Sequence, residues 1–385
     1  MKKGIWEEFD GYQRIIEEIE AAKKYREQII PGKYVTKEYV DRLHPARLTL
    51  KVADIIEETP STKTLRLAST NGALPPFLPG QYIALYPVVG PIKTGRPYSI
   101  SSPPTQTGHY DITVRRVEDG LVSNYLLDEI KTGDAIESSG PAGQFYFNPL
   151  VHDKTMVCIA GGSGITPFMS MIRDITDRGL DREVFLFYGN RTTKDIIFKD
   201  ELNRIASRFG NIHFIPVIEK PAKSYKGKCG FITGATVKEV IGNTKNKTFF
   251  MCGPQGLYDF CLPEMEALAI PVRKIRRELY GPPTQIWKYP GWPKKIKADT
   301  AFTVSVKGGK AFTAKAGESL LVSLEKEGIV VPSLCRSGEC SMCRVKVLKG
   351  KVFQPAVALV RKSDRWFGYV HSCVSFPIED LEILI

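Results

Sequence analysis

Four cysteines near the C-terminus constrain the fold more than any other feature of this chain. Cys335, Cys340 and Cys343 follow a C-x4-C-x2-C spacing, and Cys373 comes 30 positions after the third of them. Four thiolates are the ligand set of a [2Fe–2S] cluster, and this spacing is the plant-type one. Gly338 lets the loop turn tightly, so that its amide groups point at the sulfurs. The alternative metal, zinc, prefers two C-x2-C pairs, of which this chain has only one.

The segment around these cysteines, residues 300–385, reads as one compact α+β domain. It resembles plant-type ferredoxins, and the resemblance implies a β-grasp fold with the four cysteines as cluster ligands. Plant ferredoxins are typically acidic, whereas this segment holds twelve Lys and Arg against eight Asp and Glu. Arg336 and Arg344 lie beside the ligands, and we expect them to face an acidic protein partner.

The rest of the chain divides into four parts by pattern. Residues 46–150 contain short strands separated by Gly, Pro, Ser and Thr, which predicts an antiparallel β-barrel. Residues 151–280 alternate strands with helices, which predicts a doubly wound, parallel α/β domain. Residues 281–299 are rich in Pro, Gly and Lys and read as a linker. Residues 1–45 predict a helical extension that either packs on the rest of the protein or docks a partner.

Composition excludes several classes of protein. No run of about 18 apolar residues predicts a membrane span, and the N-terminus lacks the apolar stretch of a signal peptide, so we expect a cytoplasmic protein. Residues 271–299 hold eight Lys and Arg against two Asp and Glu, out of a net charge of +12. This segment is either a docking surface for an acidic redox protein or only a solvated linker. No nucleic-acid motif accompanies it, so we expect no nucleic-acid partner.

Two motifs in the predicted barrel suit a phosphate-bearing aromatic cofactor. Arg96-Pro97-Tyr98-Ser99 ends a predicted strand. The Arg can pair with a phosphate, the Tyr can stack on a flavin ring, and the Ser can form a hydrogen bond near flavin N5. Downstream, Gly120-Leu-Val-Ser123 opens a predicted helix, whose first amides suit a phosphate.

Three further motifs lie in the predicted α/β domain. The segment 160–167, AGGSGITP, follows an apolar strand directly. Its glycines let the backbone approach a pyrophosphate at the start of the next helix. Cys252-Gly253-Pro254 ends a later strand, although the cysteine also reads as a small buried residue. Tyr280 closes this region and has an alternative role as a linker anchor. Cys158, Cys229 and Cys261 lack such context and are interpreted as core or incidental.

Taken together, these motifs make residues 46–280 resemble the ferredoxin–NADP reductase superfamily. The resemblance implies a flavin bound by Arg96, Pro97, Tyr98, Ser99, Val114, Gly120, Val122 and Ser123. It implies a nicotinamide dinucleotide bound by Gly161, Gly162, Gly164, Thr166, Arg191, Cys252, Gly253 and Pro254, with Tyr280 covering the flavin face. Hydride transfer is expected beside Ser99, Thr166, Cys252 and Tyr280. The stretch beginning at Val114 favours FAD over FMN, and Arg191 slightly favours NADPH over NADH.

The predicted order of domains resembles the reductase components of bacterial multicomponent oxygenases of the phenylacetyl-CoA epoxidase type. This resemblance implies that hydride passes from NAD(P)H to FAD, then single electrons pass to the [2Fe–2S] cluster and on to a separate acceptor protein. The flavin is the necessary intermediate because nicotinamides give electrons in pairs and the cluster accepts one. Two alternatives stay open: a subunit of a larger NAD(P)H:ferredoxin oxidoreductase complex, and a redox-sensing module without turnover.

Overall fold

The computed structural model describes residues 12–26, 40, 41, 43, 45–70, 72–356 and 358–385. The chain divides into two units, Met1–Pro45 and Ala46–Ile385. The first unit contains helix α1 (Tyr12–Arg26), in which the apolar side chains of Ile15 and Ile19 are exposed. A helix is therefore present within the predicted extension, while residues 1–11, 27–39, 42 and 44 lie outside the described residues.

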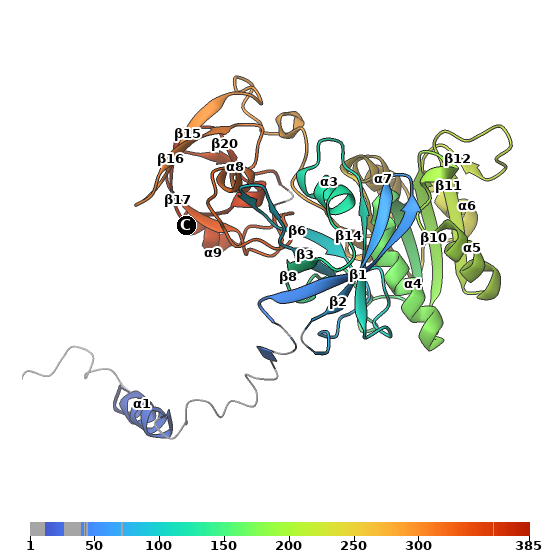
Figure 1. The fold of residues 1–385 in the computed structure, drawn as a ribbon, viewed down its shortest axis with the longest axis horizontal. Helices are drawn as coiled ribbons and strands as arrows, with labels where there is room; N and C mark the ends of the chain where they lie inside the picture. The colour runs from blue at the N-terminus through green and yellow to red at the C-terminus, as the bar shows by residue number, and fades with distance from the viewer. Residues whose placement is uncertain (1–11, 27–39, 42, 44, 71, 357) are drawn as a thin grey trace, which may run out of the picture. The chain divides into compact units, whose positions relative to one another are not determined.

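The second unit begins with the predicted antiparallel barrel (Figure 1). Its sheet has the strand order β6-β3-β8-β1-β2-β7. A bridge between Ile100, directly after β6, and Ile112, within β7, joins the two outer strands and closes the barrel. Alternate residues such as Leu65 and Leu67 point into the core, as expected for strands with one buried face. The strands are β1 (Leu48–Thr59), β2 (Thr62–Ser69), β3 (Tyr82–Leu85), β6 (Arg96–Ser99), β7 (His109–Arg115) and β8 (Ala135–Ser138).

Two smaller elements decorate this barrel. A hairpin of β4 (Val88–Val89) and β5 (Ile92–Lys93) precedes β6. Helix α3 (Leu121–Asp128) follows β7, where the sequence predicts a helix. Its N-cap is Gly120, and a Cβ atom there would lie 2.4 Å from the Ser123 hydroxyl oxygen and 2.8 Å from the Val117 Cβ, so a larger residue would require this turn to shift.

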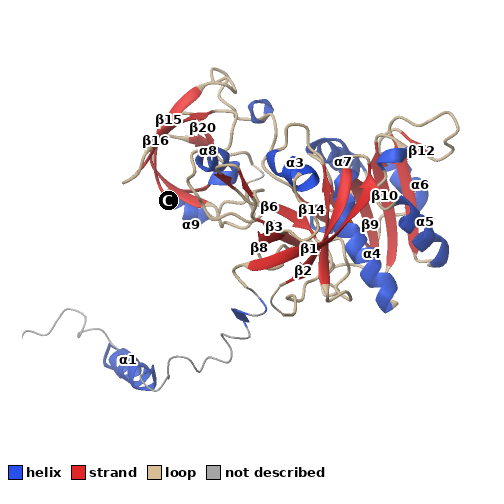
Figure 2. Cartoon of the chain, viewed as in Figure 1, coloured by secondary structure: helices blue, strands red, loops and turns tan. Residues whose placement is uncertain are grey.

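The next domain is the predicted parallel α/β sheet, with the strand order β12-β11-β10-β9-β13-β14. Apolar clusters cover both of its faces, and helices pack on both sides (Figure 2). The strands are β9 (Thr155–Gly161), β10 (Glu183–Asn190), β11 (Ile212–Ile218), β12 (Lys228–Cys229), β13 (Lys247–Cys252) and β14 (Ile275–Glu278). The helices are α4 (Thr166–Arg178), α5 (Lys199–Arg208), α6 (Gly234–Ile241) and α7 (Gln255–Ala267). Short 3₁₀ turns are η2 (Gly162–Ile165), η3 (Thr193–Asp195) and η4 (Val272–Lys274).

The C-terminal domain is a mixed sheet with the strand order β16-β15-β21-β17-β19, crossed by helix α8 (Leu320–Lys326). This arrangement confirms the predicted α+β β-grasp class. Helix α9 (Lys362–Trp366) and the turn η6 (Ser372–Val374) complete it. Its strands are β15 (Ala301–Val306), β16 (Ala311–Lys315), β17 (Arg344–Lys349), β18 (Val352–Phe353), β19 (Tyr369–His371), β20 (Phe376–Pro377) and β21 (Leu381–Leu384).

The segment predicted as a linker, residues 281–299, packs on the C-terminal domain. Ile286, in the short turn η5 (Ile286–Lys288), and Trp292 are both buried. They form a small core with Phe376, and the Trp292 ring meets Phe353 edge-on. The linker is therefore part of the C-terminal domain's packing over much of its length.

Candidate functional site

A pocket of about 630 Å³ opens at the carboxyl ends of the parallel strands. The glycine-rich turn after β9 lines it, together with Arg191 after β10 and Gly253-Pro254 after β13. Two of the predicted glycines are required sterically. Gly162 has a φ of 54°, and a Cβ on Gly164 would lie 2.1 Å from the Cys252 carbonyl oxygen. The turn and the strand end therefore touch through bare backbone, as a dinucleotide pyrophosphate site requires.

The remaining predicted residues of this motif have defined places. Thr166 is buried at the start of α4, and its hydroxyl donates to the Ser163 carbonyl at 3.0 Å. Pro167 occupies the first turn of that helix, which suits its fixed φ. Arg191 is exposed and lines the pocket, and Glu219 lines it as well. Two cations, Arg115 and Arg191, and the Glu219 carboxylate thus line the same pocket.

Ser99, Cys252 and Tyr280 come from three distant parts of the chain and meet at one point. The Ser99 and Tyr280 hydroxyl oxygens are 2.6 Å apart. The Cys252 thiol forms a hydrogen bond with the Tyr280 hydroxyl, and burial raises the pKa of both groups well above its ordinary value. Both groups are therefore neutral near pH 7. Tyr280 also lines the dinucleotide pocket, so this cluster joins the barrel to that pocket.

The predicted flavin residues of the barrel lie on β6 and around α3. Burial raises the pKa of Tyr98, and Arg96 donates from Nη1 to the Thr94 hydroxyl at 2.6 Å and to the Gly95 carbonyl at 2.8 Å. The Ser123 hydroxyl accepts from the Val117 amide at 3.2 Å. The side chains of Val114 and Val122 lie in the barrel core.

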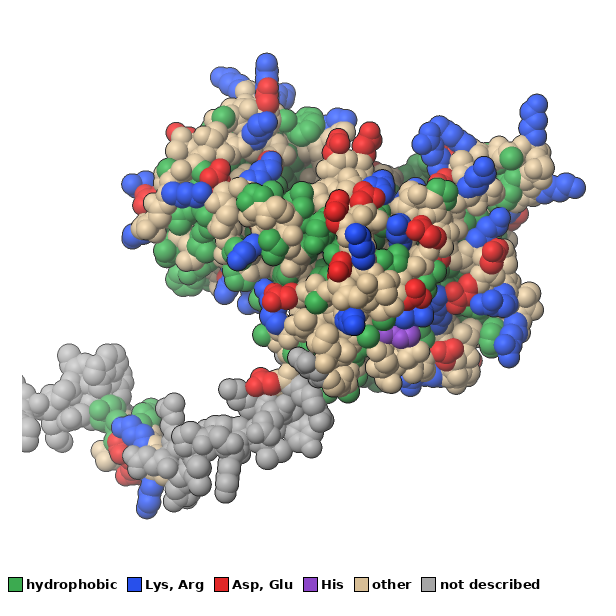
Figure 3. Space-filling model, viewed as in Figure 1, with side chains coloured by type: hydrophobic (Ala, Val, Ile, Leu, Met, Phe, Trp, Pro, Cys, Tyr) green, Lys and Arg blue, Asp and Glu red, His purple; other side chains and the backbone are tan. Residues whose placement is uncertain are grey.

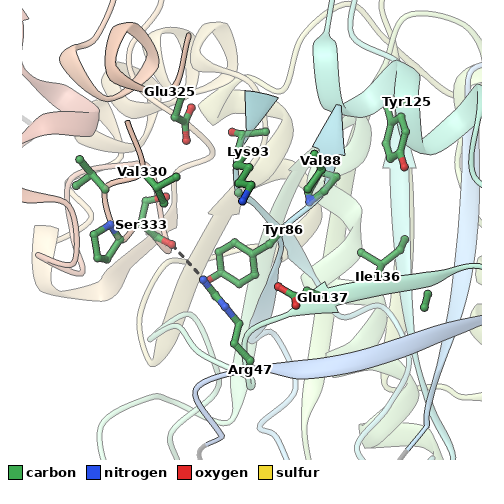
Figure 4. Close-up of a pocket in the computed structure, with 16 residues that line it drawn as sticks. Arg47, Tyr86, Val88, Lys93, Tyr125, Ile136, Glu137, Glu325, Val330 and Ser333 are labelled. Atoms are coloured by element: carbon green, nitrogen blue, oxygen red, sulfur yellow. Dashed lines mark hydrogen bonds between the residues drawn. The ribbon is translucent and has the colours of Figure 1, made fainter. Parts of the chain in front are cut away.

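A second pocket, of about 510 Å³, lies between the barrel and the C-terminal domain (Figure 4). The Arg47 guanidinium stacks 3.4 Å from the centre of the Tyr86 ring, and the Tyr86 hydroxyl donates to the Ser333 carbonyl at 3.4 Å. In Figure 4, Ser333 and Val330 of the C-terminal domain form one wall of the pocket, opposite Tyr86. The residues directly before β6, Lys93, Thr94 and Gly95, also line this pocket.

The four predicted ligand cysteines form two pairs. A hydrogen bond from the Cys340 thiol, the largest effect, lowers the pKa of Cys335, and the Cys335 sulfur also accepts the Ser337 and Cys340 amides at 3.4 Å. A hydrogen bond from Cys373 likewise lowers the pKa of Cys343. Among the described residues, no three metal-binding side chains converge as a site for a single ion. Two pairs of thiols fit a two-iron cluster with two ligands per iron better than one zinc ion.

The prediction that Arg336 faces a partner is wrong. Its side chain is 3% exposed and forms a bidentate ion pair with Glu325, at 2.6 and 2.9 Å. The burial follows from the loop, because Arg336 has a φ of 57° and turns its side chain onto α8. Arg344 is partly exposed and pairs with the buried Asp364 at 3.0 Å.

Comparison with known proteins agrees with this geometry. Residues 48–147 match the oxidoreductase FAD-binding domain family, residues 158–262 the oxidoreductase NAD-binding domain family, and residues 304–377 the 2Fe-2S iron-sulfur cluster binding domain family. The chain is a three-domain oxidoreductase that binds FAD, NAD(P)H and a [2Fe–2S] cluster. We refer to its parts as the FAD, NAD and 2Fe-2S domains.

Relatives that match over most of their own length are named as reductases or oxidoreductases. The chain is 28% identical to the glycine betaine monooxygenase reductase subunit of Pseudomonas aeruginosa, over 88% of this chain and 95% of that protein. It is 29% identical to NADH oxidoreductase HCR of Escherichia coli, over 86% and 96%. The solved structure of phthalate dioxygenase reductase superposes with a TM-score of 0.64 at 25% identity, covering 88% of this chain and 97% of that one. Among the described residues, no helix has the length and apolar character needed to cross a membrane.

Sequence reasoning missed residues that act across domains. Arg115, at the end of β7 in the FAD domain, reaches the NAD domain, where its Nη1 would be 2.5 Å from a Cβ on Gly162. Tyr82 pairs with Ser99 in the barrel, and burial together with the nearby Cys335 and Cys340 thiols raises its pKa. Glu325 lies 3.9 Å from Arg96 across the FAD and 2Fe-2S domains. Such pairs are distant in sequence, and no local motif marks them.

Proposed function

We propose that the chain takes hydride from NAD(P)H and delivers single electrons through its 2Fe-2S domain to a separate acceptor protein. Bound FAD supplies the chemistry that converts the electron pair into single electrons. The observation that carries the proposal is the meeting of Ser99, Cys252 and Tyr280, because it joins the flavin strand to the dinucleotide pocket. The three named relatives are reductases or oxidoreductases, which supports the same reaction class.

Each group of residues has a proposed task. Arg96, Tyr98 and Ser99, with Gly120 and Ser123, bind and orient the flavin. The glycine-rich turn binds the pyrophosphate, and Cys252 with Tyr280 excludes water between the nicotinamide and the flavin. Cys335, Cys340, Cys343 and Cys373 hold the cluster, and the amides on Cys335 stabilise its thiolate. We expect the protein in the reducing cytoplasm, where such thiols persist.

We further propose that the acceptor is an acidic redox protein that docks on the 2Fe-2S domain beside the cluster loop. Large apolar side chains are exposed there, including Trp366 at 81% and Met342 at 53%. Leu359, also exposed, donates its amide to the Gly338 carbonyl inside the cluster loop at 3.3 Å. Exposed Lys362 and Arg365 flank Trp366, and Figure 3 shows Lys and Arg side chains spread around this lobe. An apolar centre with a basic rim fits an acidic partner.

An anaerobic titration with NADPH, and separately with NADH, tests the proposed reaction. We expect the flavin and cluster absorption bands to bleach within seconds with at least one of the two nucleotides. A flavin band that neither nucleotide bleaches would refute hydride transfer. A cluster that stays oxidised beside a reduced flavin would refute the internal electron path.

The docking surface has its own test. Trp366→Ala should slow the reduction of cytochrome b5, used as an acidic protein probe, while the reduction of ferricyanide stays unchanged. Trp287→Ala is the matched control, because Trp287 is also exposed but lies in the linker. Equal effects of the two variants on cytochrome b5 reduction would remove the case for this surface.

A further inference from the structure

Three charged side chains connect β6, the flavin strand that begins at Arg96, to the cluster loop, residues 335–343. Arg336, one residue after the ligand Cys335, pairs with Glu325 of α8 through Nη1 and Nη2 of its guanidinium group. The Glu325 carboxylate in turn lies 3.9 Å from Nη1 of Arg96 on β6. The Glu325 side chain is 7% exposed and the Arg336 side chain 3%, so this ion pair is shielded from water, while the Arg96 side chain is 31% exposed.

This chain of charges is not balanced. Two guanidinium groups share one carboxylate, which leaves a surplus of one positive charge in a largely buried interface. Burial, and then the charge of Arg336, lower the pKa of Arg96 to about 10, while Glu325 opposes that change. An unpaired charge away from water is costly unless an anion approaches it.

Arg96 retains donors for such an anion. Among the described residues, all hydrogen bonds and ion pairs of Arg96 are made by Nη1. Nε and Nη2 therefore remain free for a phosphate, and the fork of an Arg suits phosphate oxygens. The second pocket, which Glu325 also lines, opens beside this strand and gives space for the group.

A second contact ties the same two domains. Tyr86, on the segment that leads to the β4–β5 hairpin, donates to the Ser333 carbonyl, two residues before Cys335. The FAD and 2Fe-2S domains are thus joined both by this hydrogen bond and by the charged contact of Arg96 with the Glu325–Arg336 pair.

We propose that Glu325 is a positioning residue that docks the 2Fe-2S domain on the flavin strand, and that a flavin phosphate bound by Arg96 strengthens this docking. The phosphate supplies the missing negative charge and offsets the repulsion between Arg96 and Arg336. By linkage, docking of the 2Fe-2S domain tightens flavin binding by the same factor. This inference rests on the proposed function and adds the element that holds its two electron carriers together.

Hydrogen exchange of the full chain tests docking without relying on turnover. In the wild type, adding FAD to deflavinated protein should slow amide exchange in residues 86–96 and 330–336. Glu325→Gln should abolish most of this protection and weaken FAD binding on the order of tenfold. Glu327→Gln is the matched control, because Glu327 lies at the end of the same helix and pairs with the exposed Lys310 at 2.9 Å.

Stopped-flow reduction by the better nucleotide gives the second readout. With Glu325→Gln, flavin reduction should keep its rate, whereas cluster reduction should slow on the order of tenfold because the domain is less often docked. Glu325→Gln leaves Arg336 without its partner, so the cluster spectrum must first show an intact 2Fe-2S domain. If it does not, the double variant Glu325→Gln/Arg336→Gln removes the buried pair together and still lacks the charge that faces Arg96.

The outcomes are distinct. If FAD leaves exchange in residues 330–336 of the wild type unchanged, or if Glu325→Gln behaves like Glu327→Gln in both readouts, the docking role of Glu325 is overturned. If the wild-type cluster is not reduced at all, the proposed electron path fails. In that case the exchange experiment still decides whether Glu325 docks the domain.

Discussion

Replacing Gly164 by alanine tests whether the two backbone segments of the dinucleotide pocket must touch. The new Cβ would lie 2.1 Å from the Cys252 carbonyl oxygen, 2.4 Å from its carbon and 2.7 Å from the Gly253 nitrogen. All three are backbone atoms, so no side chain can rotate away. The turn after β9 must therefore move from β13 by about 1 Å, and overpacking of this kind costs about 1–3 kcal/mol.

The expected result is a loss of both stability and hydride transfer. A displacement of about 1 Å in a positioning element can lower a rate by roughly 100-fold. We expect Gly164→Ala to lower the melting temperature of the protein and to slow NAD(P)H-dependent flavin reduction roughly 10- to 100-fold in stopped-flow measurements. Reduction of the flavin by dithionite should be unaffected, because that reaction does not use the pocket.

Gly256→Ala is the matched control. Gly256 lines the same pocket, but no heavy atom lies within 4 Å of its added Cβ. Gly256 also lies in α7, where alanine is favoured over glycine by about 0.5–1 kcal/mol. This variant should match or exceed the wild type in stability. If Gly164→Ala reduced the flavin as fast as Gly256→Ala, close contact between the turn and β13 would not be needed for the reaction.

Three further outcomes are expected. Arg191→Ala should lower kcat/KM for NADPH about tenfold relative to NADH. Glu219→Gln should shift the nucleotide preference toward NADPH. If neither variant changed the preference, both residues would be excluded from recognising the 2′ position. Tyr280→Phe removes the hydrogen bond to Ser99 and keeps the ring, so flavin reduction should slow no more than about tenfold, and a larger loss would show that the hydroxyl is essential. Cys373→Ser should abolish the cluster absorption while NAD(P)H still bleaches the flavin band; an intact cluster in this variant would exclude Cys373 as a ligand.

Local chemistry explains which features could be predicted from the sequence. The cysteine spacing, the glycine-rich turn and the Arg96-Pro-Tyr-Ser strand each work within a few residues, so their patterns indicated the three domain folds correctly. The meeting of Ser99 with Tyr280 depends on contacts 181 residues apart, and it was expected only through the family resemblance. The position of Arg336 was predicted wrongly for a related reason. A count of charges treats each Arg as exposed to solvent, whereas Arg336 forms a buried ion pair with Glu325 of α8.

The structure of the linker, residues 281–299, also differs from its prediction. Its Pro, Gly and Lys content is typical of an extended spacer. However, Ile286 and Trp292 are apolar anchors within it, and they pack against Phe376 of the 2Fe-2S domain. Composition averages over a segment and hides two well-placed apolar side chains, which are enough to order it.

These two differences together indicate how the cluster is kept near the flavin. Because the linker is packed on the 2Fe-2S domain from Ile286 onward, it tethers that domain closely. The approach of the 2Fe-2S domain to the FAD domain depends instead on contacts between the two domains, including Tyr86 with Ser333 and Arg96 with Glu325. Such contacts are few and partly electrostatic, so they can be changed without unfolding either domain. Transfer of electrons within the chain should therefore be more sensitive to substitutions at these contacts than the hydride step, which we propose for the pocket beside the glycine-rich turn.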